Sequence, residues 1–257
     1  MSQLERVVKQ FTELAPAYAS APHIQDTQAL ELLLTAVGAN PNDSSLDVAC
    51  GTGSVVCHFA SNVRHATGID VTPAMLTSAR ELQQSHGLNN VSWQTGDAND
   101  LPYPRGHFSI VTCRYALHHF DHPSRVLAEM VRVCKLGGRV GVVDLAVSES
   151  PEEAERFNKL EKLHDPSHVR ALPLSQHLDL FARASLPLPQ VIRYNIDFTL
   201  SRLQRALVST PERAVAAETL IRNSLKGDSL GTNTRETDGE LVFSYPVAII
   251  CSTVVKP

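Results

Sequence analysis

The stretch Asp47-Val-Ala-Cys-Gly51-Thr-Gly53 is the most informative segment of the chain. It ends a short apolar run, residues 45–49, and leads into a helical one. Gly51 and Gly53 permit a tight turn and leave room for a ligand, since neither carries a Cβ atom. We expect the amides at the start of the helix to face that ligand. Asp70 ends the next predicted strand, where a carboxylate of a doubly wound fold accepts hydrogen bonds from ribose hydroxyls. The loop and the acid together predict an adenosine-containing cofactor at the carboxyl ends of the strands.

Strands and helices alternate over residues 45–145, beginning with the strand that leads into this loop. The predicted strands cover residues 45–49, 65–70, 91–95, 108–113 and 139–145. Helical stretches lie between several of them. Such alternation is typical of a parallel sheet that helices cover on both faces.

Further elements flank this core. Helices are predicted at residues 4–14, 24–37, 151–163 and 175–184, and two late strands at 191–200 and 241–255. About forty residues between the late strands are too many for a plain hairpin, so we interpret residues 201–240 as a lid inserted at the sheet edge. We interpret the whole chain, 1–257, as one domain with a helical cap (1–40), a cofactor-binding core (41–146) and a C-terminal part (147–257).

The composition of the 257 residues is that of a folded globular protein, with 43% hydrophobic and 19% charged residues. The net charge of −4 gives no electrostatic reason to expect a nucleic acid as partner. Neither a signal peptide nor insertion into a membrane is expected. The five cysteines are scattered without a Cys-x-x-Cys pair, so we expect no metal site and no disulfide framework, and we predict a cytoplasmic location.

The glycine loop also bears on the choice of cofactor. Dinucleotide-binding loops carry a third glycine, and Val56 stands at that position here. Asp47, just before the loop, would repel a pyrophosphate but would suit the amino group of a methionine moiety. These two features favour S-adenosylmethionine over NAD.

Several motifs extend this interpretation to a family. The chain resembles class I S-adenosylmethionine-dependent methyltransferases, and most of all the small-molecule branch that contains the ubiquinone- and menaquinone-biosynthesis enzymes. The resemblance is carried, in order and spacing, by Leu46-Asp-Val-Ala-Cys-Gly-Thr-Gly53, Gly68-Ile-Asp70, Gly96-Asp-Ala98, Arg114-Tyr-Ala-Leu-His-His-Phe120 and Lys135-Leu-Gly-Gly-Arg-Val140. It implies an α/β fold with a doubly wound, Rossmann-like seven-stranded sheet whose last strand is antiparallel.

The resemblance implies polar contacts to the cofactor. Asp47, Gly51 and Gly53 are expected to hold its methionine end, and Asp70 its ribose. Asp97 is expected to accept a hydrogen bond from the adenine amino group, which is chemically sensible because that group donates and a carboxylate accepts.

Other contacts are implied by the same resemblance. Ala98 is expected to supply a backbone donor to the adenine, and Val71 and Met75 to pack on its faces. Tyr18 belongs to an N-terminal segment expected to fold over the cofactor; simple helix packing is the alternative for this residue. Arg114, which opens one of the motifs, is also expected to bind the cofactor.

The implied activity is the in-line transfer of a methyl group from S-adenosylmethionine to a small organic acceptor. His118 and His119 follow the fourth strand, at the edge where an acceptor would lie, and histidine can take a proton near neutral pH. We expect one of them to act as base and Asp144 to orient it or to contact the substrate. The alternative is that these residues only shape the loop.

Other functions stay open at this stage. One alternative is an NAD(P)-dependent oxidoreductase, and another is a non-catalytic cofactor-binding scaffold subunit. The sequence leaves open the acceptor, the atom that is methylated and the oligomeric state. The lid arginines are interpreted as a solvated helical face rather than an anion site: Arg202, Arg205, Arg213 and Arg222.

Overall fold

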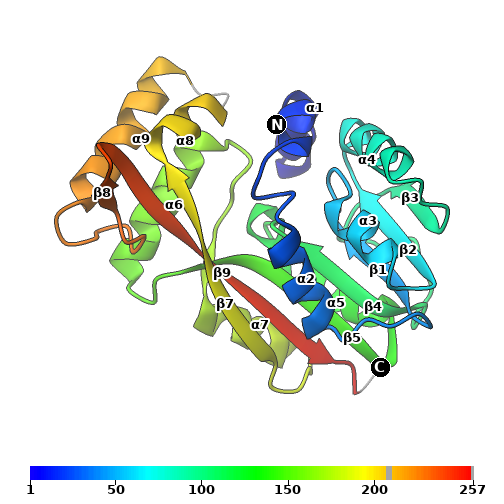
Figure 1. The fold of residues 1–257 in the computed structure, drawn as a ribbon. Helices are drawn as coiled ribbons and strands as arrows, with labels where there is room; N and C mark the ends of the chain where they lie inside the picture. Colours follow the sequence, from blue (N-terminus) through cyan, green and yellow to red (C-terminus); the bar gives the residue numbers. More distant parts are fainter. Residues whose placement is uncertain (207–209, 256–257) are drawn as a thin grey trace.

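A central sheet organises the computed structural model, which describes residues 1–206 and 210–255, with residues 204–206 described by their backbone alone. The strands have these bounds: β1 Ser44–Val48, β2 His65–Asp70, β3 Val91–Thr95, β4 Phe108–Arg114, β5 Cys134–Val147, β6 Leu172–Pro173, β7 Gln190–Thr199, β8 Arg235–Thr237 and β9 Glu240–Thr253. Seven of them follow the order β3-β2-β1-β4-β5-β9-β7 (Figure 1). Two short strands extend the sheet, β6 beside β5 and β8 beside β9.

The strand directions confirm the predicted fold class. Strands β1 to β5 pair in parallel, and the last strand, β9, is antiparallel to both β5 and β7. The predicted bounds of β2 and β3 match the observed ones. The two short additions, β6 and β8, were not expected.

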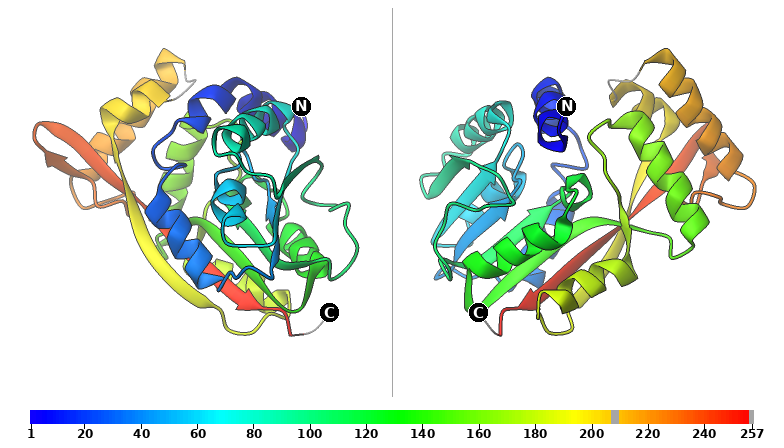
Figure 2. Two further views of the ribbon diagram at one scale, coloured as in Figure 1. Left: turned by 45° about the vertical axis from the view of Figure 1, so that its right-hand side comes forward. Right: turned by 180° about the vertical axis from the view of Figure 1, so that it is seen from behind.

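Helices cover both faces of the sheet (Figure 2). Their bounds are α1 Gln3–Ala19, α2 Thr27–Ala36, α3 Ser54–Ala60, α4 Pro73–Ser85, the 3-10 helix η1 Leu117–His119, α5 Pro123–Val133, α6 Pro151–His164, α7 Leu174–Arg183, α8 Leu200–Ala206 and α9 Pro211–Ser224. One buried apolar cluster contains Leu33 of α2, Phe59 of α3 and Leu76 of α4, and a second contains Met130 of α5 and Phe181 of α7. None of the helices in the described ranges has the length and apolar character needed to cross a bilayer.

Helix α1 lies above the carboxyl ends of the parallel strands, between α4 on one side and α6 and α8 on the other (Figures 1 and 2). It runs beyond its predicted end and continues through Pro16. The capping box formed by Ser2 and Glu5 fixes its start, because each side chain binds the other residue's amide. The helix therefore presents a continuous wall to the site below it.

The predicted lid contains α8, α9 and β8 and begins next to β7. Residues 207–209 of this prediction lie outside the described residues. Ile221 of α9 belongs to the same buried cluster as Leu160 of α6 and Phe243 of β9. The lid is therefore anchored on the C-terminal part of the chain.

Candidate active site

Two adjoining cavities lie at the carboxyl edge of the sheet. The first, of about 380 Å³, is lined by the ends of β1, β2 and β4, and we call it the strand-end cavity. The second, of about 400 Å³, is lined by residues that include His23, His118, His119 and His164, and we call it the histidine cavity. The two share four lining residues: Phe11, Tyr18, Tyr115 and His119.

Two buried acids line the strand-end cavity. Asp47 of β1 accepts a hydrogen bond from the Thr112 hydroxyl at 2.7 Å, and burial raises the pKa of Asp47 to about 7. Asp70, at the end of β2, accepts from the amides of Gly51 and Thr72, each at 2.8 Å. Burial also raises the pKa of Asp70. Arg114 only partly offsets the effect of burial on the pKa of Asp47, and neither acid forms an ion pair within the described ranges. Both acids therefore favour a ligand that brings hydrogen-bond donors or positive charge.

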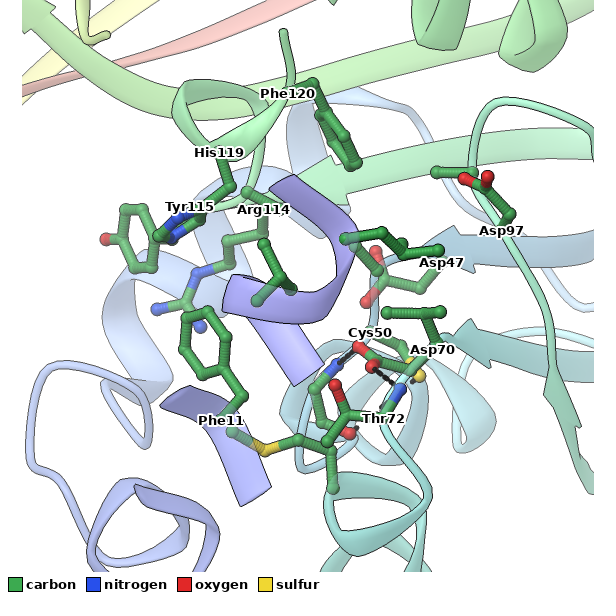
Figure 3. Close-up of a pocket in the computed structure, with 18 of the residues that line it drawn as sticks. Phe11, Asp47, Cys50, Asp70, Thr72, Asp97, Arg114, Tyr115, His119 and Phe120 are labelled. Atoms are coloured by element: carbon green, nitrogen blue, oxygen red, sulfur yellow. Dashed lines mark hydrogen bonds between the residues drawn. The ribbon is translucent and has the colours of Figure 1, made fainter. Parts of the chain in front are cut away.

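A third acid and an apolar surface complete this side of the cavity. Asp97 accepts hydrogen bonds from the Asn99 amide and side chain through one oxygen, both at 2.9 Å. Val71, Met75 and Ala98 line the same cavity. Figure 3 shows the acids on one side and aromatic rings on the other: Asp47, Asp70 and Asp97 face Phe11, Tyr115 and His119.

The glycine loop has the strained geometry that its composition predicts. Gly51 and Gly53 have φ values of +52° and +81°, and a Cβ atom on Gly53 would lie 2.5 Å from the Trp93 ring. Two amides of the loop itself are engaged within the protein: the Gly51 amide donates to Asp70, and the Gly53 amide donates to the Cys50 carbonyl at 3.0 Å. Both bonds form because the left-handed turn directs these amides back into the protein. The expectation that the amides at the start of α3 face a ligand stays a prediction.

The structure brings together almost all of the predicted cofactor residues. Those that line the strand-end cavity are Tyr18, Asp47, Gly51, Asp70, Val71, Met75, Asp97, Ala98 and Arg114. Gly53 is not among them, because it forms the N-cap of α3 behind the loop. The guanidinium of Arg114 donates to the carbonyls of His23 and Ile24 at 2.9 and 3.0 Å, and so fixes the segment after α1 to the sheet.

The structure gives His118 and His119 different hydrogen-bond partners, although they are adjacent in sequence. His118 Nδ1 lies 2.5 Å from one Asp144 oxygen, and the His118 amide donates to the other at 3.0 Å. Burial alone would lower the pKa of His118, but the Asp144 carboxylate outweighs burial and the pKa is raised. Conversely, His118 holds the pKa of Asp144 below its usual range despite burial. Asp144 lines neither cavity, whereas His118 lines the histidine cavity.

His119 has a different environment. Its Nδ1 lies 3.2 Å from both the carbonyl and the hydroxyl of Ser167. Burial and the neighbouring His118 lower the pKa of His119 to about 4. The Phe11 ring meets it edge-on, with ring centroids 5.1 Å apart. His119 is therefore a neutral ring at the junction of the two cavities.

Several residues of the histidine cavity were not expected from the sequence. They come from segments far apart in the chain: His23, Tyr115, Leu145, Glu161, Ile196, Phe198, Arg202, Leu203 and Tyr245. A partial signal exists on α6, where Phe157, Glu161 and His164 recur at helical spacing on its inner face. No local pattern links that face to Phe198 or Tyr245, because the link is made by the pairing of β7 with β9.

Comparison with known proteins agrees with this geometry. A family model described as "Methyltransferase domain" matches residues 46–142. An uncharacterised methyltransferase of Bacillus subtilis, YcgJ, is 33% identical over 186 residues, which are 72% of this chain and 74% of the relative. Ajmaline N-methyltransferase of Rauvolfia serpentina is 32% identical over 200 residues, covering 70% of this chain and 67% of the relative.

Further matches agree in function class and fold. Demethylmenaquinone methyltransferase of Listeria monocytogenes is 30% identical over 165 residues, covering 60% of this chain and 68% of the relative. The crystal structure of YcgJ superposes with a TM-score of 0.83 at 28% identity, covering 90% of this chain and all of that one. The fold and the matches define a class I, Rossmann-like methyltransferase of the small-molecule type. The chain belongs to this methyltransferase family, which confirms the resemblance noted in its motifs.

Proposed function

We propose that this methyltransferase takes the methyl group from S-adenosylmethionine in the strand-end cavity and transfers it to a small organic molecule in the histidine cavity. The observation that carries the proposal is that the two cavities adjoin and share Phe11, Tyr18, Tyr115 and His119. A methyl donor and a methyl acceptor can thus meet where the cavities join, while each is bound mainly by the residues of its own cavity. In-line transfer depends on such alignment more than on any covalent help from the protein.

The strand-end cavity fits this cofactor better than a dinucleotide. Asp47, just before the loop, would repel a pyrophosphate but complements an amino group, while Asp70 and Asp97 complement ribose hydroxyls and an adenine amino group. The amides of Gly51 and Gly53 are engaged within the protein and give a phosphate no donor. This supports the methyltransferase over the oxidoreductase alternative.

The proposed chemistry assigns a role to few residues. When bound, S-adenosylmethionine supplies a methyl group on a positively charged sulfur, which keeps the bonding electrons as the methyl leaves. His118, with Nδ1 held by Asp144, has Nε2 left to take the proton of an acceptor hydroxyl or carbon acid. The apolar rings at the junction, Phe11 and Tyr115, would exclude water from the reacting atoms.

The chain is also proposed to be a single domain. One buried cluster contains Leu33 of the N-terminal cap, Val143 of the core and Ile221 of the lid. A continuous core of this kind favours one folding unit over separable parts.

The cofactor is tested by calorimetry with the purified protein. S-adenosylmethionine and S-adenosylhomocysteine should both give binding heat, and NAD should give none. Binding of NAD without either adenosyl compound would favour an oxidoreductase and overturn the proposal.

The base is tested with His118→Gln. Loss of the base should lower kcat by about 10³-fold or more while the affinity for S-adenosylhomocysteine stays unchanged, because His118 does not line the strand-end cavity. The matched control is His86→Gln, which changes an exposed histidine at the end of α4. Release of S-adenosylhomocysteine measures the rate, and an unchanged kcat in His118→Gln would remove this residue from the mechanism.

A further inference from the structure

The histidine cavity contains a guanidinium that the proposed transfer does not use. Arg202 of α8 lines this cavity, together with Leu203 of the same helix and Phe198 of β7. Its guanidinium carbon lies 5.0 Å from the centre of the Phe198 ring. The side chain is thus held against an aromatic wall, which fixes a cation without neutralising it.

The partner of Arg202 is also uncharged. Nη2 of Arg202 lies 3.2 Å from Nδ1 of His23. Burial, with the nearby Arg202 and Arg114, lowers the pKa of His23 to about 4, so this imidazole accepts as a neutral ring. Among the described residues, no aspartate or glutamate forms an ion pair with Arg202.

The acids of the same cavity are hydrogen-bonded to groups of the chain and do not contact Arg202. Glu161 accepts a hydrogen bond from the Tyr245 hydroxyl, and His164 Nδ1 lies 3.9 Å from it. Asp165 accepts from the amide and hydroxyl of Ser167 at 2.7 and 2.6 Å. Their hydrogen-bond donors come from the protein, whereas the guanidinium of Arg202 has no ion-pair partner among residues 1–206 and 210–255.

The other arginine near the junction does not share this property. Arg114 donates to the carbonyls of His23 and Ile24 and to the Ser54 hydroxyl, which fixes it in a structural position. Arg202 is therefore the guanidinium suited to a ligand. The sequence places Arg202 on a solvated helical face; in the structure its side chain is half-buried, packs on Phe198 of β7 and His23 after α1, and lines the cavity.

We propose that the methyl acceptor is an organic anion: an apolar, ring-containing molecule whose carboxylate or other oxyanion pairs with Arg202. The planar fork of an arginine suits such groups, since it can donate two parallel hydrogen bonds. The remaining wall is largely apolar and aromatic, with Leu14, Ile196, Phe198 and Tyr245. Arg202 is half-buried, forms no ion pair among the described residues and is in contact with the aromatic wall, so an acceptor anion would supply its charged partner. The inference rests on the proposed function, because it takes the histidine cavity as the acceptor site.

Binding of matched probes tests this inference without any need for turnover. The probes are hydroxylated one-ring and two-ring aryl carboxylates, each paired with its neutral carboxamide, together with the corresponding aryl phosphates. Affinities are measured by calorimetry or ligand-observed NMR in the presence of S-adenosylhomocysteine. At least one carboxylate or phosphate should bind about tenfold or more tightly than its carboxamide. Comparing the carboxylates with the phosphates identifies the type of oxyanion.

Variants then assign the preference to one residue. Arg202→Gln should reduce the preference for the anion to within about twofold, and Arg202→Lys should keep part of it, because a lysine retains the charge but loses the fork. Arg222→Gln is the control, since Arg222 lies on the lid, pairs with Glu218 and lines neither cavity. An unchanged melting temperature and affinity for S-adenosylhomocysteine would show that the Arg202 variants are folded.

The outcomes separate this inference from the proposed function. Equal affinity of every anion and its carboxamide, or a preference that survives in Arg202→Gln, would overturn the anionic acceptor. In either case, normal binding of S-adenosylmethionine would leave the methyltransferase proposal intact. If the adenosyl compounds fail to bind, the proposed function itself is wrong.

Discussion

The strand-end cavity and the histidine cavity adjoin, yet their acids are balanced in different ways. Asp47 and Asp70 are buried and form no ion pair with a described residue, and burial raises the pKa of both, although Arg114 lowers that of Asp47 in part. Asp144, behind the histidine cavity, is equally buried but is paired with His118, and its pKa is lowered. The acids of the strand-end cavity are therefore free to pair with a positively charged ligand, whereas Asp144 already has a partner within the protein. Burial alone therefore does not set the protonation state of a carboxylate, because a charged partner can reverse its effect on the pKa.

Asp144→Asn should have the largest effect, because it removes the carboxylate that pairs with His118. We expect kcat to fall by about 10³-fold, since an amide neither fixes the imidazole tautomer nor stabilises its charged form. The base must be neutral, so the rate rises with pH through the raised pKa of His118. Without the carboxylate that pKa falls, and the acid limb of the pH–rate profile moves to lower pH. An unchanged acid limb would contradict the His118–Asp144 assignment.

Gly53→Ala tests how closely the glycine loop of the strand-end cavity packs against its neighbours. The substitution places a Cβ atom at φ +81° and 2.5 Å from Trp93, which should lower the free energy of unfolding by about 3 kcal/mol. Gly239→Ala is the control, because Gly239 has φ +76° but open space around it, and should cost about 1 kcal/mol. Urea denaturation measures both. Equal losses would mean that contact with Trp93 carries no part of the cost.

The pH dependence of cofactor binding tests Asp47 directly. Below a pKa of about 7 the ligand-free acid is protonated, and a cationic ligand favours its charged form, so binding releases a proton. The affinity for S-adenosylmethionine should therefore rise about tenfold from pH 6 to pH 8 and level off above the pKa. Calorimetry in buffers of different ionisation enthalpy counts the released proton. Asp47→Asn should bind more weakly and show no such release; release that persists in the variant would assign the proton to another group.

Tyr245→Phe should have the smallest effect and tests how much the fold depends on the hydrogen bond to Glu161 in the histidine cavity. It removes the hydroxyl that donates to Glu161 and should cost about 1 kcal/mol of stability. Tyr103→Phe is the matched control, because the buried Tyr103 hydroxyl has no hydrogen-bond partner in the described structure. Thermal unfolding compares the two. A larger loss for Tyr103→Phe would show that Glu161 does not depend on Tyr245.

Much of the parallel core could be predicted from sequence, because its signals are local. Asp70 ends a strand whose bounds match the prediction, and Gly51 and Gly53 adopt the positive φ values that only glycine takes readily. The residues expected around the cofactor lie together, apart from Gly53, because successive strand ends meet at one edge. Their roles toward the cofactor remain predictions.

The acceptor side could not be predicted in the same way, because its contacts are long-range. Arg202 meets His23 across 179 positions of sequence, and Glu161 meets Tyr245 across 84. Sequence also gave no means to choose between His118 and His119. The choice depends on which ring faces Asp144, and that is fixed by the turn of η1 after β4.

Strand β9 divides at its middle into two halves with different neighbours. Residues 247–253 pair with β5 in the main sheet, whereas residues 240–246 pair only with β7 and β8 beyond it. The outer half carries Tyr245, and its partner strand carries Phe198 and leads into Arg202. The point where β9 stops pairing with β5 is therefore a suitable boundary for a chimera with a related protein. A graft of residues 196–246 from a relative would import new substrate walls onto an unaltered cofactor-binding half.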